Sequence, residues 1–151
     1  MFERFTDTSR RAVAIANQET HRIGGNLIGD VELLIGLAKE SNGVCHRALT
    51  GIGVDLVGLR RQLEQLPRSL DDGTAPQKLP QTREFKLAIE AAIAISRESG
   101  DTHVGTEHML LGLLRHPEFA SSRALAERAV SFDRAKESIA LICPAGTKGE
   151  E

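Results

Sequence analysis

The sequence VGTEHMLLGLLRH, residues 104–116, has a counterpart upstream in IGDVELLIGLAKE, residues 28–40. Both stretches begin with an aliphatic residue followed by glycine, and each carries a second glycine seven positions later, at Gly36 and Gly112. The apolar positions agree, whereas the polar residues near the start change from Thr-Glu-His to Asp-Val-Glu. The chain therefore keeps one apolar pattern twice and varies the charged residues placed on it.

The similarity extends well beyond these two stretches. A constant shift of 76 residues aligns the two halves of the chain without a gap. Identical pairs at this offset include Thr6 with Thr82, Ala12 with Ala88, Ala16 with Ala92, Gly24 with Gly100, and Leu34 with Leu110. A fixed spacing sustained over about sixty residues indicates a tandem duplication.

Between the two copies lies PRSLDDGTAPQKLP, residues 67–80, which contains three of the five prolines of the chain. Proline has no N–H and a fixed φ, so this segment is expected to break helices and act as a linker. We therefore predict one domain over residues 1–143, with repeat 1 at 1–66 and repeat 2 at 81–143. The remaining residues, 144–151, are predicted to form a flexible tail.

Each copy has the apolar spacing of helices, with apolar residues recurring every three or four positions. Thr6 and Thr82 are suited to cap the first helix of each copy, as Asp55 and Ser131 are to cap the last. No stretch alternates with period two for long enough to form a strand, so the predicted fold class is all-α. The expected helices are 7–22, 30–40, 42–50, 55–66, 83–98, 106–115, 117–129 and 131–143.

Two features of these helices have a structural explanation. Glycine inside a helix costs about 1 kcal/mol relative to alanine, and both copies carry one, at Gly36 and Gly112. We expect these glycines to permit close contact between helices, because glycine presents no Cβ. Pro117 is expected in the first turn of its helix, where its missing N–H is not needed.

Composition excludes several classes of protein. The chain has 151 residues and a formal net charge of −2. No apolar run approaches the roughly 20 residues that a membrane helix needs, and the N-terminal MFERFTDTSRR is charged where a signal peptide would be apolar. The two cysteines, Cys45 and Cys143, are too few for a disulfide framework. These observations predict a soluble cytoplasmic protein without membrane association.

Nucleic-acid binding and catalysis are not indicated either. The chain has five Phe but no Trp or Tyr on which bases would stack, and Arg10-Arg11 and Arg60-Arg61 are isolated pairs. There is no phosphate-binding loop, no His-Glu-x-x-His zinc pattern and no Gly-x-Ser-x-Gly nucleophile setting. We predict a protein that is not an enzyme and that has no cofactor or metal.

Three segments resemble one known family: the opening MFERFT, the Gly-Thr-Glu-His-Met-Leu-Leu-Gly-Leu element at 105–113, and NGVCHRALTGIGVDLVGLRRQLEQL at 42–66. The family is the Clp repeat (Clp-N) domain, found at the N-terminus of ClpC- and ClpA-type AAA+ unfoldases, and the resemblance is nearest to the ClpC branch. It implies a pseudo-two-fold bundle of eight helices made from two four-helix repeats.

The resemblance also implies a function. It predicts a non-catalytic protein-binding module of the Clp chaperone–protease system, which docks adaptor or substrate proteins for an AAA+ unfoldase. We expect a free-standing regulator that acts on the unfoldase in trans. The alternative is the detached N-terminal domain of a full-length ClpC-type ATPase.

A second alternative is a phosphoarginine-binding sensor. By resemblance, each repeat would form a site from the threonine that opens its first helix and the glutamate of Gly-Thr-Glu. In repeat 2 these residues are Thr82 and Glu107, whereas repeat 1 keeps Thr6 but has Val31 at the glutamate position. A helix N-terminus favours phosphate and a carboxylate pairs with a guanidinium. The first site is therefore expected to be lost or altered, and a surface carboxylate with a helix cap is the simpler interpretation of Glu107 and Thr82.

Overall fold

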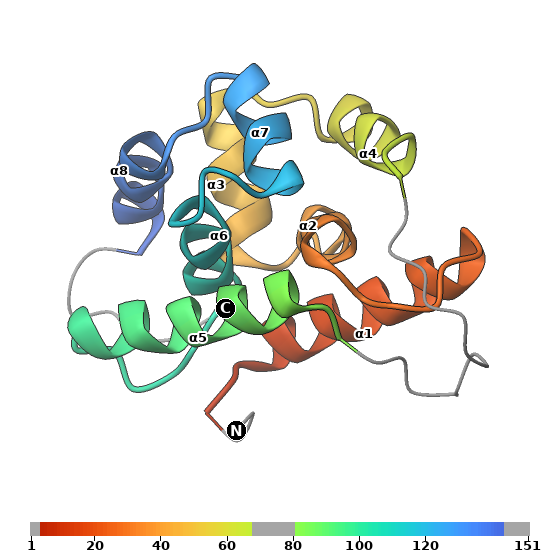
Figure 1. Cartoon of the computed structure of the whole chain (residues 1–151). Coiled ribbons are helices and arrows are strands. Elements are labelled where there is room, and N and C mark those ends of the chain that lie inside the picture. Colours follow the sequence, from red (N-terminus) through yellow and green to blue (C-terminus); the bar gives the residue numbers. More distant parts are fainter. Residues whose placement is uncertain (1–3, 68–80, 144–151) are drawn as a thin grey trace.

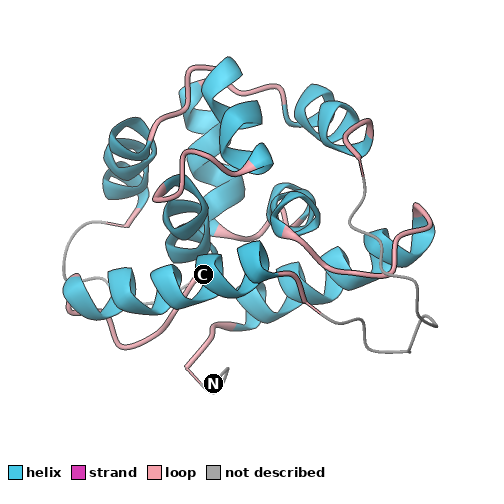
Figure 2. Ribbon diagram, in the orientation of Figure 1, coloured by secondary structure: helices cyan, strands magenta, loops and turns pink. Residues whose placement is uncertain are grey.

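The computed structural model describes residues 4–67 and 81–143, which form helices joined by loops and turns (Figures 1 and 2). In these two segments the structure is all-α, as predicted, apart from two isolated β-bridges. None of the described helices is long and apolar enough to cross a membrane. The helices are α1 Asp7–Arg22, α2 Asp30–Lys39, α3 Val44–Ile52, α4 Leu56–Glu64, α5 Arg83–Glu98, α6 Thr106–Leu114, α7 Ala120–Glu127 and α8 Phe132–Ile142.

The predicted linker and tail lie outside the described residues, apart from Pro67 at the start of the linker. Within the described segments, six of the eight helices begin within one residue of the predicted start. The exceptions are α3 and α7, the third helix of each repeat, which begin at Val44 and Ala120. Pro117 therefore precedes α7, and the prediction that it lies in the first helical turn was wrong.

The late starts of α3 and α7 have a common cause in hydrogen bonds from the opposite repeat. Cys45 in α3 donates its amide N–H to Oγ1 of Thr106 at 3.0 Å. The equivalent amide in α7, that of Ser121, donates to Oδ2 of Asp30 at 3.0 Å. Thr106 and Asp30 are the first residues of α6 and α2. Each repeat thus caps the third helix of the other, which satisfies an N–H that a helix leaves unpaired at its start.

The two repeats are also joined through the segments that precede their helices. Phe5 forms a parallel bridge with Val104, and Gln81 forms one with Ile28. The first pair maps onto the second at the 76-residue offset, because 5 corresponds to 81 and 28 to 104. The start of each repeat is therefore fixed to the other repeat, in two equivalent contacts related by the pseudo-two-fold axis.

Helices α2 and α6 form the centre of the molecule. They lie above α1 and α5 in Figure 1, with α3 and α7 on the opposite side of them. All residues of α6, and all of α2 except Lys39, are buried. Such all-round burial explains why the apolar residues of these two helices are not confined to one face and why their apolar pattern recurs in both repeats.

The mid-helix glycines lie at the closest approach of two helices. A Cβ at Gly112 would stand 2.5 Å from the carbonyl oxygen of Ala88 in α5, and one at Gly36 would lie closer still to the carbonyl oxygen of Ala12 in α1. In each case the nearest atoms belong to the backbone, which cannot move aside as a side chain does. The expectation that the glycines permit close helix contact is confirmed.

We predict that Gly112→Ala lowers the free energy of unfolding by about 1–3 kcal/mol, because forced overpacking outweighs the gain of about 1 kcal/mol in helix propensity. Urea denaturation followed by circular dichroism measures the change. Gly58→Ala in α4 is the matched control, since its Cβ would approach only the side chains of Asp55 and Arg128 and no backbone atom among its nearest neighbours. Equal or greater stability of the Gly112 variant would show that the close contact is unimportant.

Candidate functional site

The two threonines predicted for the phosphoarginine sites act as helix caps. The amide N–H of Ser9 donates to Oγ1 of Thr6, and that of Phe85 donates to Oγ1 of Thr82, both at 3.1 Å. Each threonine is the N-cap residue of its helix, α1 or α5. The capping predicted from the sequence is confirmed for both residues.

The structure does not combine these threonines with the glutamate position of their own repeat. The amide of Thr6 donates to the carbonyl oxygen of Val104 at 3.0 Å, and that of Thr82 donates to the carbonyl oxygen of Ile28 at 2.9 Å. Thr6 of repeat 1 thus lies beside the segment that leads into Glu107, whereas Thr82 lies beside the corresponding segment of repeat 1. A site built from Thr82 and Glu107 within one repeat does not match this arrangement.

Glu107 lies in the first turn of α6 with only 5% of its surface exposed. It lines a cleft of about 400 Å³ between α5, α6 and α8. Neither Thr6 nor Thr82 lines this cleft. Its other acidic residues are Glu98 and Asp101, its basic residues are His108, Arg115 and Lys136, and its apolar residues include Ile95, Leu111, Phe132 and Ile139.

His108 is bonded at both ring nitrogens. Its Nδ1 accepts a hydrogen bond from the amide of Gly105 at 2.9 Å. A neutral imidazole that accepts at Nδ1 carries its proton on Nε2, which donates to Oδ2 of Asp101 at 2.7 Å. His108 therefore caps α6 and fixes the Asp101 carboxylate at the side of the cleft.

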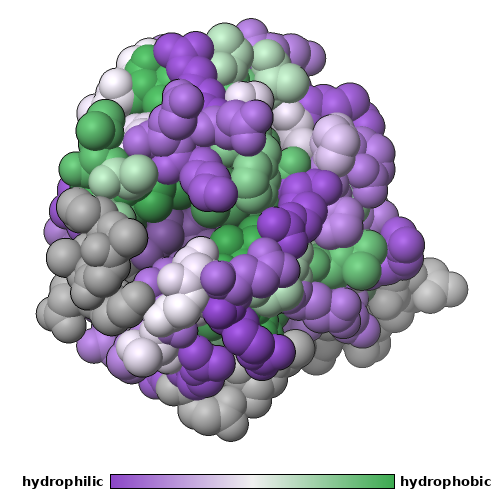
Figure 3. All heavy atoms as spheres, turned by 90° about the vertical axis from the view of Figure 1, so that its left-hand side faces the viewer, coloured by the Kyte–Doolittle hydropathy of each residue, from purple (hydrophilic) through white to green (hydrophobic). Residues whose placement is uncertain are grey.

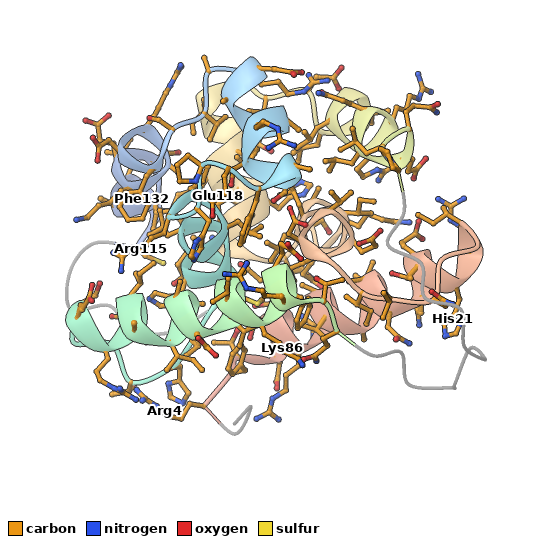
Figure 4. The ribbon with its side chains drawn as sticks, in the orientation of Figure 1. Arg4, His21, Lys86, Arg115, Glu118 and Phe132 are labelled. Atoms are coloured by element: carbon orange, nitrogen blue, oxygen red, sulfur yellow. The ribbon has the colours of Figure 1, made fainter. Side chains whose placement is uncertain are left out.

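The side chains of Arg115 and Glu98 form the rim of the cleft. The guanidinium of Arg115 lies over the ring of Phe132, 5.5 Å from its centroid, and the two residues are adjacent in Figure 4. Nη2 of Arg115 is 3.6 Å from Oε1 of Glu98, on the last turn of α5. Figure 3 shows this side of the molecule, where apolar surface is bordered by hydrophilic residues. The cleft therefore combines an apolar interior with charges of both signs.

The equivalent place in repeat 1 is occupied by ion pairs. Oε1 of Glu19 lies 2.7 Å from Nη2 of Arg22, and Oε2 lies 2.9 Å from Nζ of Lys39. Arg22 also reaches Oε2 of Glu64 at 2.9 Å. At the 76-residue offset these positions correspond to Ile95, Glu98, Arg115 and Ala140, all of which line the cleft of repeat 2. The two repeats therefore present different surfaces at matching positions.

No group of three His, Cys, Asp or Glu side chains suited to hold a metal ion occurs in the described part of the chain. The cleft was not predicted from the sequence, because its walls come from three helices and its lining residues are spread from Ile95 to Cys143. The geometry defines a class of protein: a duplicated all-α domain with a cleft on its second repeat.

Residues 4–128 match the family described as the Clp repeat (R) N-terminal domain. The chain belongs to this family, as its resemblance to the Clp repeat domain predicted. It is 33% identical over 140 residues to the chaperone protein ClpB of Oceanobacillus iheyensis, covering 92% of this chain and 17% of that protein. It is 32% identical over 149 residues to the negative regulator of genetic competence ClpC/MecB of Bacillus subtilis, covering 99% of this chain and 18% of that protein.

Solved structures share the fold. The N-terminal domain of the chaperone ClpD from Arabidopsis thaliana superimposes with a TM-score of 0.75 at 21% identity, covering 94% of this chain and 96% of that one. The N-terminal domain of Hsp104 from Candida albicans superimposes with a TM-score of 0.76 at 15% identity, covering 96% and 95%. This chain spans less than a fifth of the two full-length relatives described above.

The ion pairs of repeat 1 predict a pH dependence of stability. The hydrogen bond from Arg22, with a further contribution from Lys39, lowers the pKa of Glu19 below its usual value of 4.5, although burial opposes the shift. A carboxyl group whose pKa is lowered on folding stabilises the native state above its unfolded pKa, and this contribution is lost as the pH falls through the folded value.

Glu19→Gln should therefore reduce the free energy of unfolding at pH 7, and the difference from wild type should shrink as the pH falls below 4.5. Urea titrations at a series of pH values measure it. Glu98→Gln is the control, because the side chain of Glu98 is 63% exposed and its ion pair is long, so little change is expected. A difference that stays constant down to acidic pH would contradict the assignment.

Proposed function

We propose that the chain is a non-catalytic protein-binding module of the Clp chaperone–protease system in the cytoplasm, which docks adaptor or substrate proteins for an AAA+ unfoldase. The observation that supports this proposal is the cleft between α5, α6 and α8, in a chain of the Clp repeat family. We further propose that the chain is free-standing and acts on the unfoldase in trans.

The chemistry of the cleft suits a polypeptide ligand. Its volume of about 400 Å³ lies within the range of binding pockets, roughly 300–1,000 Å³. The half-buried Phe132 offers apolar surface to a side chain, while Lys136 and Glu98 at the edge are exposed and available to charged or polar neighbours. The buried His108 is bonded at both nitrogens, which favours binding over acid–base chemistry.

We predict that Lys136→Glu, which reverses a charge on the cleft, reduces capture of the partner about tenfold or more, because an acidic partner group that pairs with Lys136 would then face a like charge. The measurement is affinity capture from the native cell with quantitative mass spectrometry. Captured proteins must include a Clp ATPase, a Clp adaptor or a substrate of the protease.

Arg61→Glu in α4 is the matched control. It makes the same charge reversal on an exposed helical residue that does not line the cleft, so capture should be unchanged. Wild-type bait that recovers no Clp component would refute the proposed function. Equal loss with both variants would refute the cleft as the binding surface.

One observation favours phosphoarginine as a ligand of the same cleft. The carboxylate of Glu107 and the cationic groups of Arg115 and Lys136 line one cavity. A carboxylate pairs with a guanidinium, and cationic side chains bind phosphate. We propose that such a site would use Glu107 without Thr82 or Thr6, since both threonine hydroxyls cap helices.

Isothermal titration calorimetry with phosphoarginine tests this second candidate. Glu107→Gln should weaken binding about tenfold to a hundredfold, because a charge-assisted hydrogen bond contributes about 1.5–3 kcal/mol. Thr82→Ala should lower stability through the lost cap while leaving affinity unchanged. Absence of binding by wild type, or full affinity in the Glu107 variant, would rule out phosphoarginine as the ligand. Neither result would contradict the proposal that the chain is a protein-binding module.

A further inference from the structure

A polar pocket lies on repeat 1 and shares no lining residue with the cleft. It has a volume of about 430 Å³ and is lined by Arg11 of α1, by Ser41 and Asn42 in the turn before α3, and by Arg47 in the first turn of α3. We propose that this Arg11–Arg47 pocket binds the carboxylate of an aspartate or glutamate side chain of a partner protein. The inference rests on the proposed function, to which it adds the chemistry of one contact.

Arg11 is held in place by a buried acid. Its Nε donates to Oε1 of Glu40 at 3.0 Å, and Glu40 is only 5% exposed. Oε2 of Glu40 accepts the amide N–H of Asn42 at 3.0 Å, so the carboxylate is fixed on both oxygens. This bond uses one of the five N–H donors of the guanidinium, and the Arg11 side chain remains 52% exposed. Arg11 is therefore oriented in advance, with donors left over for a ligand.

Arg47 has no comparable structural role. It is exposed, and within the described residues no carboxylate lies within ion-pair distance of its guanidinium and no hydrogen bond from its side chain is formed. A guanidinium presents a planar fork that matches a carboxylate in two parallel hydrogen bonds. Its position at the positive end of the α3 dipole also favours an anion.

The charge of the pocket selects the class of anion. Arg11 and Arg47 supply two positive charges and Glu40 one negative charge, which leaves a net charge of +1. A carboxylate carries a charge of −1 and balances this site. A phosphate monoester carries about −1.5 to −2 at pH 7 and would place excess negative charge near the buried Glu40. Ser41 and Asn42 at the edge add neutral donors that suit either oxygen of a carboxylate.

The second repeat lacks this pocket, which indicates that the pocket is not needed for folding. At the 76-residue offset Arg11 corresponds to Leu87, and Ser41 and Asn42 correspond to Pro117 and Glu118. The arginine equivalent to Arg47 is present as Arg123, but its Nη1 donates to the backbone carbonyl of Glu118. Since repeat 2 folds to the same arrangement without the pocket, the pair of arginines is not required for the fold.

The probe for the test is a glycine–serine peptide that carries two glutamates, and the readout is the NMR spectrum of the ¹⁵N-labelled chain. We expect the glutamate peptide to shift the side-chain Nε–H of Arg47 and the backbone amide of Asn42, with weaker binding at higher salt. Arg47→Gln should weaken binding about tenfold or more, as loss of a charged hydrogen-bond donor does. Arg123→Gln, the matched variant in repeat 2, should leave binding unchanged.

Several results would overturn the inference. Equal binding of a peptide with glutamine in place of glutamate, unchanged affinity of the Arg47 variant, or absence of binding by wild type would each reject the carboxylate site. Tighter binding of a phosphoserine peptide at the same residues would show that the pocket prefers a phosphate to a carboxylate. None of these results affects capture of Clp components through the cleft, so the failure of this inference is distinguishable from failure of the proposed function.

Discussion

The absence of a side chain at Gly36 and Gly112 sets the geometry on which the rest of the structure depends. At Gly112 the backbone of α6 comes so near to α5 that a Cβ would stand 2.5 Å from the carbonyl oxygen of Ala88. This close contact brings α2 and α6 deep enough to be buried on every face and to contact helices of both repeats. A larger residue would push both central helices outward and loosen the contacts between the halves.

The halves then depend on each other for their local structure. Thr106 of repeat 2 caps α3, and Asp30 of repeat 1 caps α7, so each third helix starts where the opposite repeat provides an acceptor. The segments that precede α1 and α5 are likewise bonded to the opposite repeat. We infer that a single repeat would leave unsatisfied N–H groups at two helix ends, so the duplicated unit is the smallest part with a complete set of partners.

Local patterns allowed much of this fold to be predicted. Apolar spacing predicted the helices, threonine at a helix start predicted two N-caps, and the glycines within helices predicted close contact between helices. The features that were missed depend on residues far apart in the sequence. The caps of α3 and α7 join residues separated by 61 and 91 positions, and the cleft that Glu107 lines has walls from three helices. A pattern within one segment carries no information about such contacts, so the sequence alone did not show that Thr6 and Thr82 each bond to the opposite repeat.

The side chain at the third position of α2 and α6 explains why the apolar pattern persists while the charges change. Glu32 accepts the amide N–H of Gly29 at 2.8 Å, and His108 accepts that of Gly105 at 2.9 Å. The helix start requires a hydrogen-bond acceptor there and does not require a particular charge. Charge was therefore free to diverge: repeat 2 has an open cleft where repeat 1 has a network of ion pairs around Glu19. Two copies of one fold thus present two different surfaces at matching positions.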